Sequence, residues 1–280
     1  MNYRHGYHAG NFADVLKHAV LACAALRLAR AAKPVHAIDL HAGAGLYDLQ
    51  APNALKTGEW RDGIGRVLAQ GQAPDVLKPY LDIVRGVNEK GELRHYPGSP
   101  LILRETLRPQ DKISLYELRP EDEQALAALC KADKRVRARR ADGWKSLGAE
   151  LKPADVRPLV LIDPPFESDA DFDRSLDALA AVRTRSPAAT AIVWHPIKDE
   201  KPVAAFRDKV KRSTTDALLV AELAVAPPVK GERLTACGLL ILRPPRGLND
   251  DLFAMLPWLK DKLALADGAN ASWRWLIAPR

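Results

Sequence analysis

The chain has 280 residues, of which 47% are hydrophobic and 28% charged, and its formal net charge is +7. This length allows one large α/β domain or two small ones, and no apolar run approaches the roughly 18 residues that cross a membrane. The N-terminus lacks the apolar core of a signal peptide, and the three cysteines are too scattered for disulfides or structural zinc, so we expect a cytoplasmic protein without bound metal.

The first predicted element is an amphipathic helix from Asn11 to about Arg30, whose apolar side chains recur at helical spacing. It ends before Pro34, and residues 35–40 are typical of a short strand that runs into the glycine-rich turn at 41–45. Residues 46–96 are polar and punctuated by proline and glycine, with short helical patterns and no strong strand. We therefore expect a helical insertion over 46–96.

Strand and helix patterns alternate along the rest of the chain. Ser99 is a favourable helix N-cap and Pro100 a favourable first helical residue, so a helix is predicted to begin there. Predicted strands follow at 112–118, 135–138, 159–162, 190–194, 218–226, 235–242 and 273–277, and predicted helices at 121–132, 171–183 and 203–212. Such alternation indicates an α/β fold with a doubly wound, mostly parallel sheet and crossover helices.

One strand end carries the most informative motif. Directly after the apolar run 158–162 stand Asp163, Pro164, Pro165 and Phe166. Prolines fix φ at about −65° and have no backbone donor, which leaves nearby carbonyls free to accept hydrogen bonds. A carboxylate, a free carbonyl and an aromatic face suit a planar ring with an exocyclic amine, such as adenine. The alternative interpretation is a strand-to-turn junction that happens to contain two prolines.

Three further strand ends carry groups that suit a nucleotide-like ligand, and ligands of open α/β sheets bind at such ends. The glycines of the 41–45 turn permit close backbone approach, Glu117 suits both hydroxyls of a ribose, and Asp142-Gly143 suits an adenine edge. Glu117 follows the glycines by more than the usual roughly 20 residues, and removing the insertion restores that spacing. The positive N-terminal end of the helix at Ser99 would then lie beside the glycine turn, where it favours a carboxylate.

The N-terminal segment is rich in histidine and tyrosine. Residues 3–11 read Tyr-Arg-His-Gly-Tyr-His-Ala-Gly-Asn. We expect contacts with cofactor or nucleic acid there, because aromatic rings stack on bases and arginine pairs with phosphate. Metal binding is disfavoured, since no carboxylate or cysteine accompanies the histidines. His18 is either part of the same site or a satisfied histidine on a helix face.

The densest basic run, from Lys131 to Arg140, has two interpretations. Excess positive charge attracts phosphate polymers without specifying a fold. The run is either a solvated helix end and loop or a contact with nucleic acid, and the sequence favours neither.

Several blocks together resemble the bacterial RlmJ family, adenine-N6 methyltransferases that act on 23S ribosomal RNA. They are the N-terminal block 3–18, the turn 39–45, Tyr96-Pro-Gly-Ser-Pro100, Glu117, Asp142-Gly143 and Asp163-Pro-Pro165. The resemblance covers essentially the whole chain. It implies a Rossmann-like core that uses S-adenosylmethionine, with a mostly parallel seven-stranded sheet, an antiparallel last strand and a small helical insertion. Residues 1–280 would form a single methyltransferase domain.

The resemblance also implies residue roles. Cofactor contacts carry over to His18, His41, Ser99, Glu117, Asp142, Gly143 and Asp163. Asp163 is implied as the catalytic acceptor and Tyr3 as a contact to substrate RNA; we add Pro164, Phe166 and Arg4 on the chemical grounds given above. Phe166 departs from the tyrosine that the family usually shows, which removes a phenol but keeps a stacking ring. The implied ligands are S-adenosylmethionine, its product S-adenosylhomocysteine and 23S ribosomal RNA, and we expect a monomer.

The expected chemistry is attack of an adenine N6 on the sulfonium methyl. Hydrogen bonds from the N6 protons to the Asp163 carboxylate and the Pro164 carbonyl would favour a pyramidal nitrogen, while Phe166 stacks on the flipped-out base. Three alternatives stay open. They are adenine methylation of DNA, a nicotinamide dehydrogenase in which the Asp-Pro-Pro-Phe corner would have no role, and a basic RNA-binding protein without catalysis.

Overall fold

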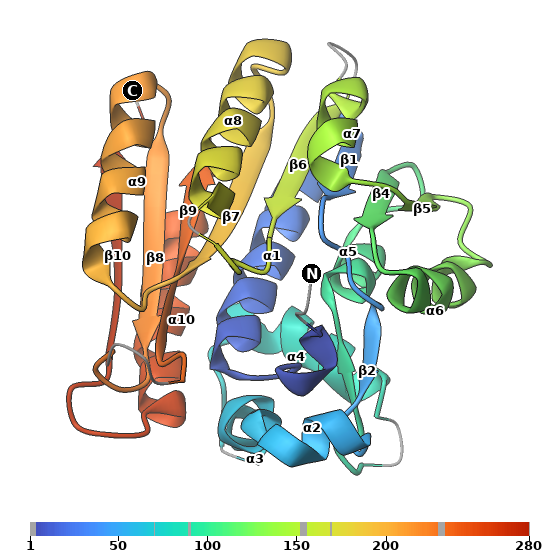
Figure 1. Ribbon diagram of the computed structural model, residues 1–280, viewed down its shortest axis with the longest axis vertical. Coiled ribbons are helices and arrows are strands. Elements are labelled where there is room, and N and C mark those ends of the chain that lie inside the picture. The colour runs from blue at the N-terminus through green and yellow to red at the C-terminus, as the bar shows by residue number, and fades with distance from the viewer. Residues whose placement is uncertain are drawn as a thin grey trace.

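The computed structural model of the protein describes residues 4–69, 71–88, 91–151, 156–168, 170–228 and 233–279. Its centre is a sheet of the strands β1 (Val35–Asp39), β4 (Lys112–Glu117), β5 (Val136–Arg140), β6 (Arg157–Ile162), β7 (Thr190–Pro196), β8 (Leu218–Ala224), β9 (Ala236–Leu242) and β10 (Asn270–Ile277). Their order across the sheet is β10-β8-β9-β7-β6-β1-β4-β5 (Figure 1). The α/β class is confirmed.

The direction of the strands divides the sheet into two parts. Strands β5, β4, β1, β6 and β7 are parallel, whereas β9 runs antiparallel to β7 and β8, and β10 runs antiparallel to β8. The mostly parallel sheet and the antiparallel last strand are confirmed. The predicted number of seven strands is wrong, since the described residues form eight. The count of seven came from the resemblance, whereas the strand patterns of the sequence number eight and include 273–277, which lies in β10. β10 joins the sheet because Ala271, Trp273 and Trp275 alternate toward the core and pack against it.

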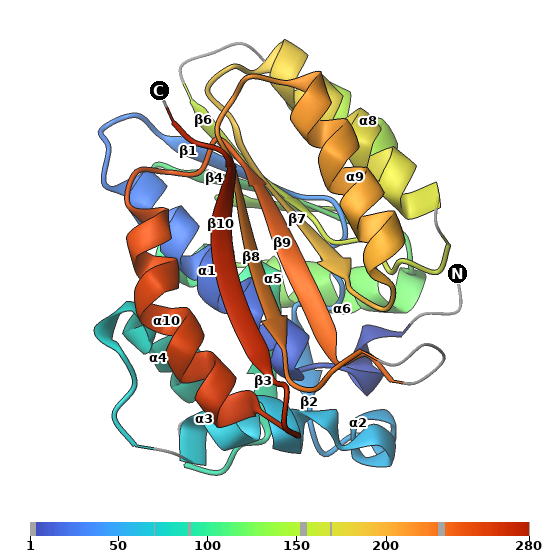
Figure 2. The same cartoon turned by 90° about the vertical axis from the view of Figure 1, so that its left-hand side faces the viewer.

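Helices cover both faces of the sheet (Figure 2). They are α1 (Phe12–Ala29), α5 (Ser99–Thr106), α6 (Pro120–Cys130) and α10 (Leu248–Leu263), and on the opposite face α7 (Gly143–Glu150), α8 (Ala170–Arg185) and α9 (Glu200–Ser213). The predicted helices at 11–30, 121–132, 171–183 and 203–212 are confirmed, while α7 and α10 were not predicted. None of the helices in the described part of the chain has the length and apolar character needed to cross a bilayer.

The helix predicted at Ser99 exists as α5, but the prediction that Ser99 caps it is wrong. Gly98 occupies the N-cap position, and the Ser99 hydroxyl instead donates to Oδ2 of Asp39 at 2.6 Å. Asp39 has no solvent exposure, so its carboxylate needs donors from within the protein. The Ser99 hydroxyl therefore ties the start of α5 to the end of β1 and does not cap the backbone N–H groups of the helix.

Residues 46–96 form the short helices that the sequence predicts, together with two strands that it does not. The segment contains β2 (Leu46–Asp48), α2 (Pro52–Thr57), the π-helical η2 (Arg61–Gly65), α3 (Arg66–Ala69), the 3-10 helix η3 (Asp75–Leu77), α4 (Lys78–Gly86) and β3 (His95–Pro97). β2 and β3 pair in an antiparallel ladder, which brings the two ends of the segment together. Strands of three residues are too short to show an alternating pattern. The segment lies beyond the carboxyl ends of the parallel strands (Figure 1).

Candidate active site

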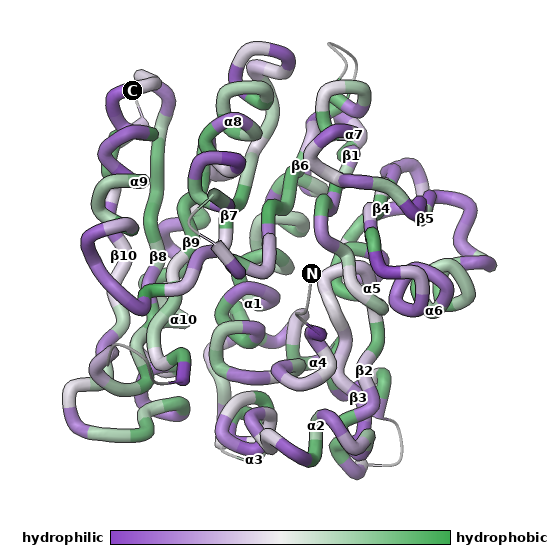
Figure 3. The backbone as a smooth tube through the Cα atoms, in the orientation of Figure 1, coloured by the Kyte–Doolittle hydropathy of each residue, from purple (hydrophilic) through white to green (hydrophobic). Residues whose placement is uncertain are grey.

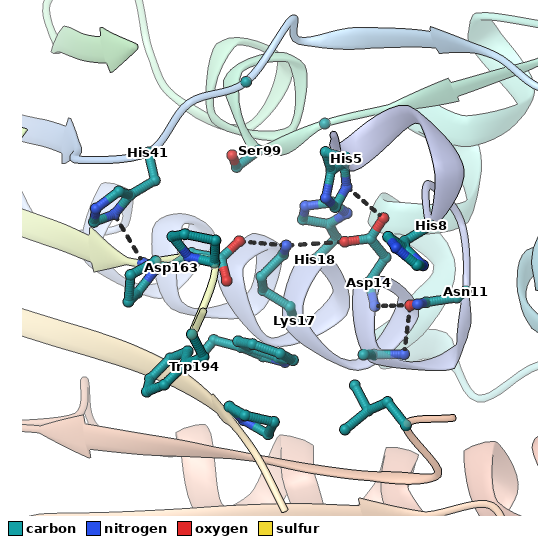
Figure 4. Close-up of a pocket in the computed structure, with 18 of the residues that line it drawn as sticks. His5, His8, Asn11, Asp14, Lys17, His18, His41, Ser99, Asp163 and Trp194 are labelled. Carbon is teal, nitrogen blue, oxygen red and sulfur yellow. Dashed lines mark hydrogen bonds and ion pairs between the residues drawn. The ribbon is translucent and has the colours of Figure 1, made fainter. Parts of the chain in front are cut away.

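A cavity of about 490 Å³ lies at the carboxyl ends of β1, β4 and β6 (Figure 4). Pockets for small ligands typically measure roughly 300–1,000 Å³. Its wall includes the predicted site residues His18, His41, Ser99, Glu117, Asp163, Pro164 and Phe166. Segments that are far apart in the sequence thus meet at one place, as the strand-end motifs predict.

Three of the predicted site residues that the structure describes, Arg4, Asp142 and Gly143, are not among the lining residues. Asp142 is the N-cap of α7, and its side chain accepts the first backbone N–H groups of that helix. A Cβ on Gly143 would lie 2.2 Å from the carbonyl oxygen of Leu40, so only glycine lets α7 approach the end of β1 this closely. Arg4 is exposed, and Tyr3 lies outside the described residues. The binding roles of these four stay predictions.

The end of β1 is organised by the buried carboxyl of Asp39. Its Oδ1 accepts the backbone N–H of His41 at 3.1 Å, while Oδ2 accepts the Ser99 hydroxyl. Burial raises the pKa of Asp39 to about 6, against the lowering effect of these hydrogen bonds. Asp39 therefore fixes the start of the glycine turn relative to α5.

Glu117 binds the same turn from the neighbouring strand. Its Oε2 accepts the N–H of Gly43 at 2.9 Å, and its Oε1 accepts the N–H of Arg119 at 2.8 Å. Gly43 has a φ of +61°, and a Cβ there would lie 2.1 Å from the hydroxyl of Tyr47. Each carboxylate oxygen keeps a second lone pair, so Glu117 retains the capacity to accept a pair of ribose hydroxyls.

Asp163, at the end of β6, is held by an ion pair. Oδ2 of Asp163 lies 2.5 Å from Nζ of Lys17, and the same ammonium lies 2.9 Å from Oδ1 of Asp14. Burial alone would lower the pKa of Lys17, but the two carboxylates hold that pKa well above its usual value. Burial would likewise raise the pKa of Asp14, yet the neighbouring His5 and Lys17 hold that pKa well below its usual value. One cation thus sits between two acids in a nearly dry site (Figure 4).

His41 supports the backbone of the same corner. Its Nδ1 accepts the N–H of Asp163 at 3.3 Å, and its ring packs edge-on against Trp144. Burial lowers the pKa of His41 to about 3, so the imidazole is neutral at physiological pH and Nδ1 remains an acceptor. His41 therefore orients Asp163 while its ring forms part of the cavity wall.

The backbone is strained at Phe166, the aromatic residue of the Asp163–Phe166 motif. Phe166 has a φ of +48°, a left-handed conformation that costs a residue with a Cβ roughly 1–2 kcal/mol. Its ring lies 4.9 Å from that of Phe172 and 5.8 Å from that of Trp194, measured between centroids. Such strain is concentrated at functional sites, and Phe166 is one of the residues that line the cavity.

His18 is anchored by the Tyr-Pro-Gly-Ser-Pro block. Its Nδ1 lies 2.8 Å from the hydroxyl of Tyr96, which in turn lies 3.0 Å from the hydroxyl of Tyr80. Burial, assisted by the neighbouring Lys17, holds the pKa of His18 well below its usual value. The predicted cofactor contact is thus a neutral, fixed ring on the cavity wall.

The N-terminal turn is bound by an acid of the 46–96 segment. Glu59 accepts a hydrogen bond from Nδ2 of Asn11 at 3.0 Å and lies 3.1 Å from Nδ1 of His8. Oδ1 of Asn11 meanwhile caps α1. The N–H of Ile64 donates to the carbonyl of Gly10 at 2.9 Å, so the π-helical turn of the segment also contacts this turn directly. The start of α1 is therefore fixed by residues 46–96.

Sequence reasoning gave no role to Asp14, Lys17 or Glu59. The signal for the first two is present, because Asp14 and Lys17 stand at i and i+3 within a mostly apolar helix. Glu59 has no comparable local signal, since its partners are about 50 residues away. In the described residues, no group of three or more His, Cys, Asp or Glu side chains has the arrangement of a metal site.

Comparison with known proteins agrees with this architecture. Residues 32–277 match the family described as ribosomal RNA large subunit methyltransferase D, RlmJ. The chain is 37% identical to ribosomal RNA large subunit methyltransferase J of Escherichia coli and 34% identical to the protein of the same name from Haemophilus influenzae, each over 99% of both chains. The crystal structure of a Legionella pneumophila protein aligns with a TM-score of 0.87 and 29% identity, over 97% of this chain and 98% of that one. The chain therefore belongs to the RlmJ family of ribosomal RNA large-subunit methyltransferases.

Proposed function

We propose that the protein transfers a methyl group from S-adenosylmethionine to the exocyclic N6 of an adenosine in 23S ribosomal RNA. The observation that carries this proposal is that Asp163 and Pro164 line the same cavity as Glu117 and Ser99. A carboxylate and a carbonyl suited to an aromatic amine thus share one space with groups suited to a nucleoside. The names of the relatives, which specify methyl transfer to large-subunit ribosomal RNA, support the same reaction.

The residues on one side of the cavity fit S-adenosylmethionine. When bound, it supplies an electrophilic methyl group on a sulfonium. Glu117 accepts the ribose hydroxyls, and the N-terminus of α5 at Gly98 and Ser99 favours the carboxylate of the amino-acid part. His18 and His41 bound the space as neutral rings. We assign Asp142 and Gly143 to the adenine ring of S-adenosylmethionine.

The residues on the other side suit an adenine that has left its stack. Because Lys17 occupies Oδ2 of Asp163, the second oxygen is available to accept one N6 proton. The Pro164 carbonyl accepts the other, and together they favour a pyramidal nitrogen whose lone pair is free for attack. The proton leaves after methyl transfer, when the nitrogen is strongly acidic, so Asp163 need not be a strong base. Phe166 and Trp194 stack on the base.

The rim of the cavity suits a polyanionic substrate. Arg119, Lys198 and Arg233 are among the residues that line the cavity, Arg119 being paired with Asp122 and Arg233 with Asp62, and the whole chain carries a net charge of +7. In this proposal Tyr3 and Arg4 contact the RNA next to the target base. The enzyme acts in the cytoplasm as a monomeric single domain without metal, and residues 46–96 are an insertion that supports the N-terminal turn.

A methyl-transfer assay tests the proposal. The protein is incubated with labelled S-adenosylmethionine and either deproteinised 23S ribosomal RNA or duplex DNA, and the nucleosides are identified by mass spectrometry. The proposal predicts N6-methyladenosine in the RNA and none in the DNA. Methylation of the DNA alone would contradict the choice of substrate, and failure to bind S-adenosylmethionine in calorimetry would contradict catalysis altogether.

A further inference from the structure

An exposed row of positive charges follows the outer edge of the sheet. β5 is the terminal strand of the sheet order. Four exposed cations lie on β5 and on the chain that leads into it, and none of them forms an ion pair in the part of the protein that the structure describes. They are Lys131, Lys134, Arg137 and Arg140, and we refer to them as the β5 basic edge. The region is strongly hydrophilic in Figure 3.

The carboxylates nearest to this edge are already engaged. Asp133 is bound by Arg135 at 2.6 Å. Glu150 accepts the hydroxyl of Tyr116 at 2.6 Å and lies 3.3 Å from Arg139. The four cations are therefore not neutralised by these acids, and their charge is available to an anionic partner.

The edge begins beside the cavity. Arg140 is the register partner of Glu117, which lines the cavity. Neighbouring strands lie about 4.8 Å apart and each residue advances about 3.3 Å, so Arg137 lies about 10 Å further along the strand. Because side chains alternate along a strand, Arg137 and Arg140 project toward opposite faces of the sheet, so the β5 basic edge presents positive charge on both sides of the terminal strand and begins beside the cavity.

We propose that the β5 basic edge binds the sugar–phosphate backbone of the substrate RNA outside the target nucleotide. The inference rests on the proposed function and adds a second contact region to it. Folded RNA is recognised largely through its phosphates and shape, and such contacts fix the orientation of the substrate without reading sequence. The edge holds the RNA arm while the target adenosine enters the cavity.

The test compares two triple variants of the full chain. One carries Lys131→Gln, Lys134→Gln and Arg137→Gln. The matched control carries Lys201→Gln, Lys211→Gln and Arg212→Gln. It removes the same charges from exposed positions of α9, which form no ion pair among the described residues and lie at the opposite end of the sheet (Figure 1). Binding to fluorescently labelled fragments of 23S ribosomal RNA is measured by anisotropy at several salt concentrations from about 50 to about 200 mM, the range over which phosphate contacts weaken strongly. Methyl transfer is measured in parallel.

For the β5 variant we expect the dissociation constant to rise about tenfold and the slope of its logarithm against log salt to fall by about two. The maximal rate at saturating RNA stays unchanged, and the α9 control retains wild-type binding. Equal affinity and salt slope in the two variants would overturn the inference. So would a β5 variant that binds naked RNA normally and loses activity only on ribonucleoprotein particles, because the edge would then recognise a protein. If the wild-type protein binds RNA without methylating it and the β5 variant binds RNA more weakly than the α9 control, the proposed function is contradicted while this inference is supported.

Discussion

Nζ of Lys17 lies 2.5 Å from Oδ2 of Asp163, although 146 positions separate the two residues in the chain. The contact joins α1 to the end of β6, and the second contact of Lys17, to Asp14, makes it a buried three-membered ion cluster. The cluster fixes one oxygen of Asp163, and the proposed mechanism uses the other oxygen. The end of β6 at Asp163 is therefore positioned by the N-terminal helix as well as by its own strand.

Replacing Lys17 by methionine removes the cation that Asp14 and Asp163 share. Breaking a buried ion pair from one side costs about 3–5 kcal/mol, because a charge is left uncompensated. We expect that loss in the free energy of unfolding measured with urea, together with loss of methyl transfer. Lys211→Met, at an exposed position of α9, is the control and should change stability by less than about 0.5 kcal/mol. Equal stability of the two variants would show that the cluster contributes nothing.

Asp39 should make the protein less stable as the pH rises through the acidic range. Its pKa is about 6 in the folded state because of burial, so between about pH 4 and 6 the folded state holds a proton that the unfolded state has lost. Stability attributable to this group falls as pH rises through that window, by about 3 kcal/mol in total.

Asp39→Asn cannot ionise and should lack this contribution. We expect the free energy of unfolding of the variant, relative to wild type, to rise between pH 4 and pH 7, measured by urea denaturation at several values about one unit apart. Taking the difference between the two proteins removes the effects of other titrating groups. A difference that stays constant with pH would show that Asp39 ionises normally in the folded state.

Much of the site follows from local sequence because its residues stand at strand ends. The glycine turn, Glu117 and Asp163 each follow an apolar strand, and parallel strands bring their carboxyl ends together. Lys17 and Glu59 could not be assigned in this way, since their partners are fixed only by tertiary packing. Ser99 shows a different limit: its local sequence favours an N-cap, but a buried carboxyl on another strand competes for the hydroxyl.

Phe166 should act by stacking, so its replacement is expected to affect the RNA more than the cofactor. Stacking of a base on an aromatic side chain contributes about 1–3 kcal/mol. Phe166→Ala should therefore raise the KM for RNA about tenfold or more, whereas Phe166→Tyr, which keeps the ring, should retain wild-type kinetics. Phe253→Ala, on the exposed surface of α10, is the control. An unchanged KM in Phe166→Ala would exclude the ring from base binding.

Glu59 should influence catalysis through the N-terminal turn, because it binds His8 and Asn11 while Asn11 caps the helix that bears Lys17. Glu59→Ala should lower kcat by about tenfold through misplacement of that helix, with cofactor affinity intact. Glu92→Ala, an exposed acid of the same 46–96 segment, should leave kcat unchanged. Partial recovery in Glu59→Gln, which keeps an acceptor for Asn11, would distinguish positioning from a general loss of stability. A Glu59→Ala enzyme with normal kcat would contradict the role.

The proposal that Asp163 binds the reacting amine is tested most directly by measuring cofactor binding in calorimetry and methyl transfer with the variant Asp163→Ala. We expect the variant to fold and to bind S-adenosylmethionine with an affinity within about tenfold of wild type, because Glu117 and the N-terminus of α5 are unchanged. We expect it to transfer methyl groups to 23S ribosomal RNA at least about 100-fold more slowly than wild type. Transfer at close to the wild-type rate would show that the Asp163 corner does not bind the reacting amine, and it would contradict the account.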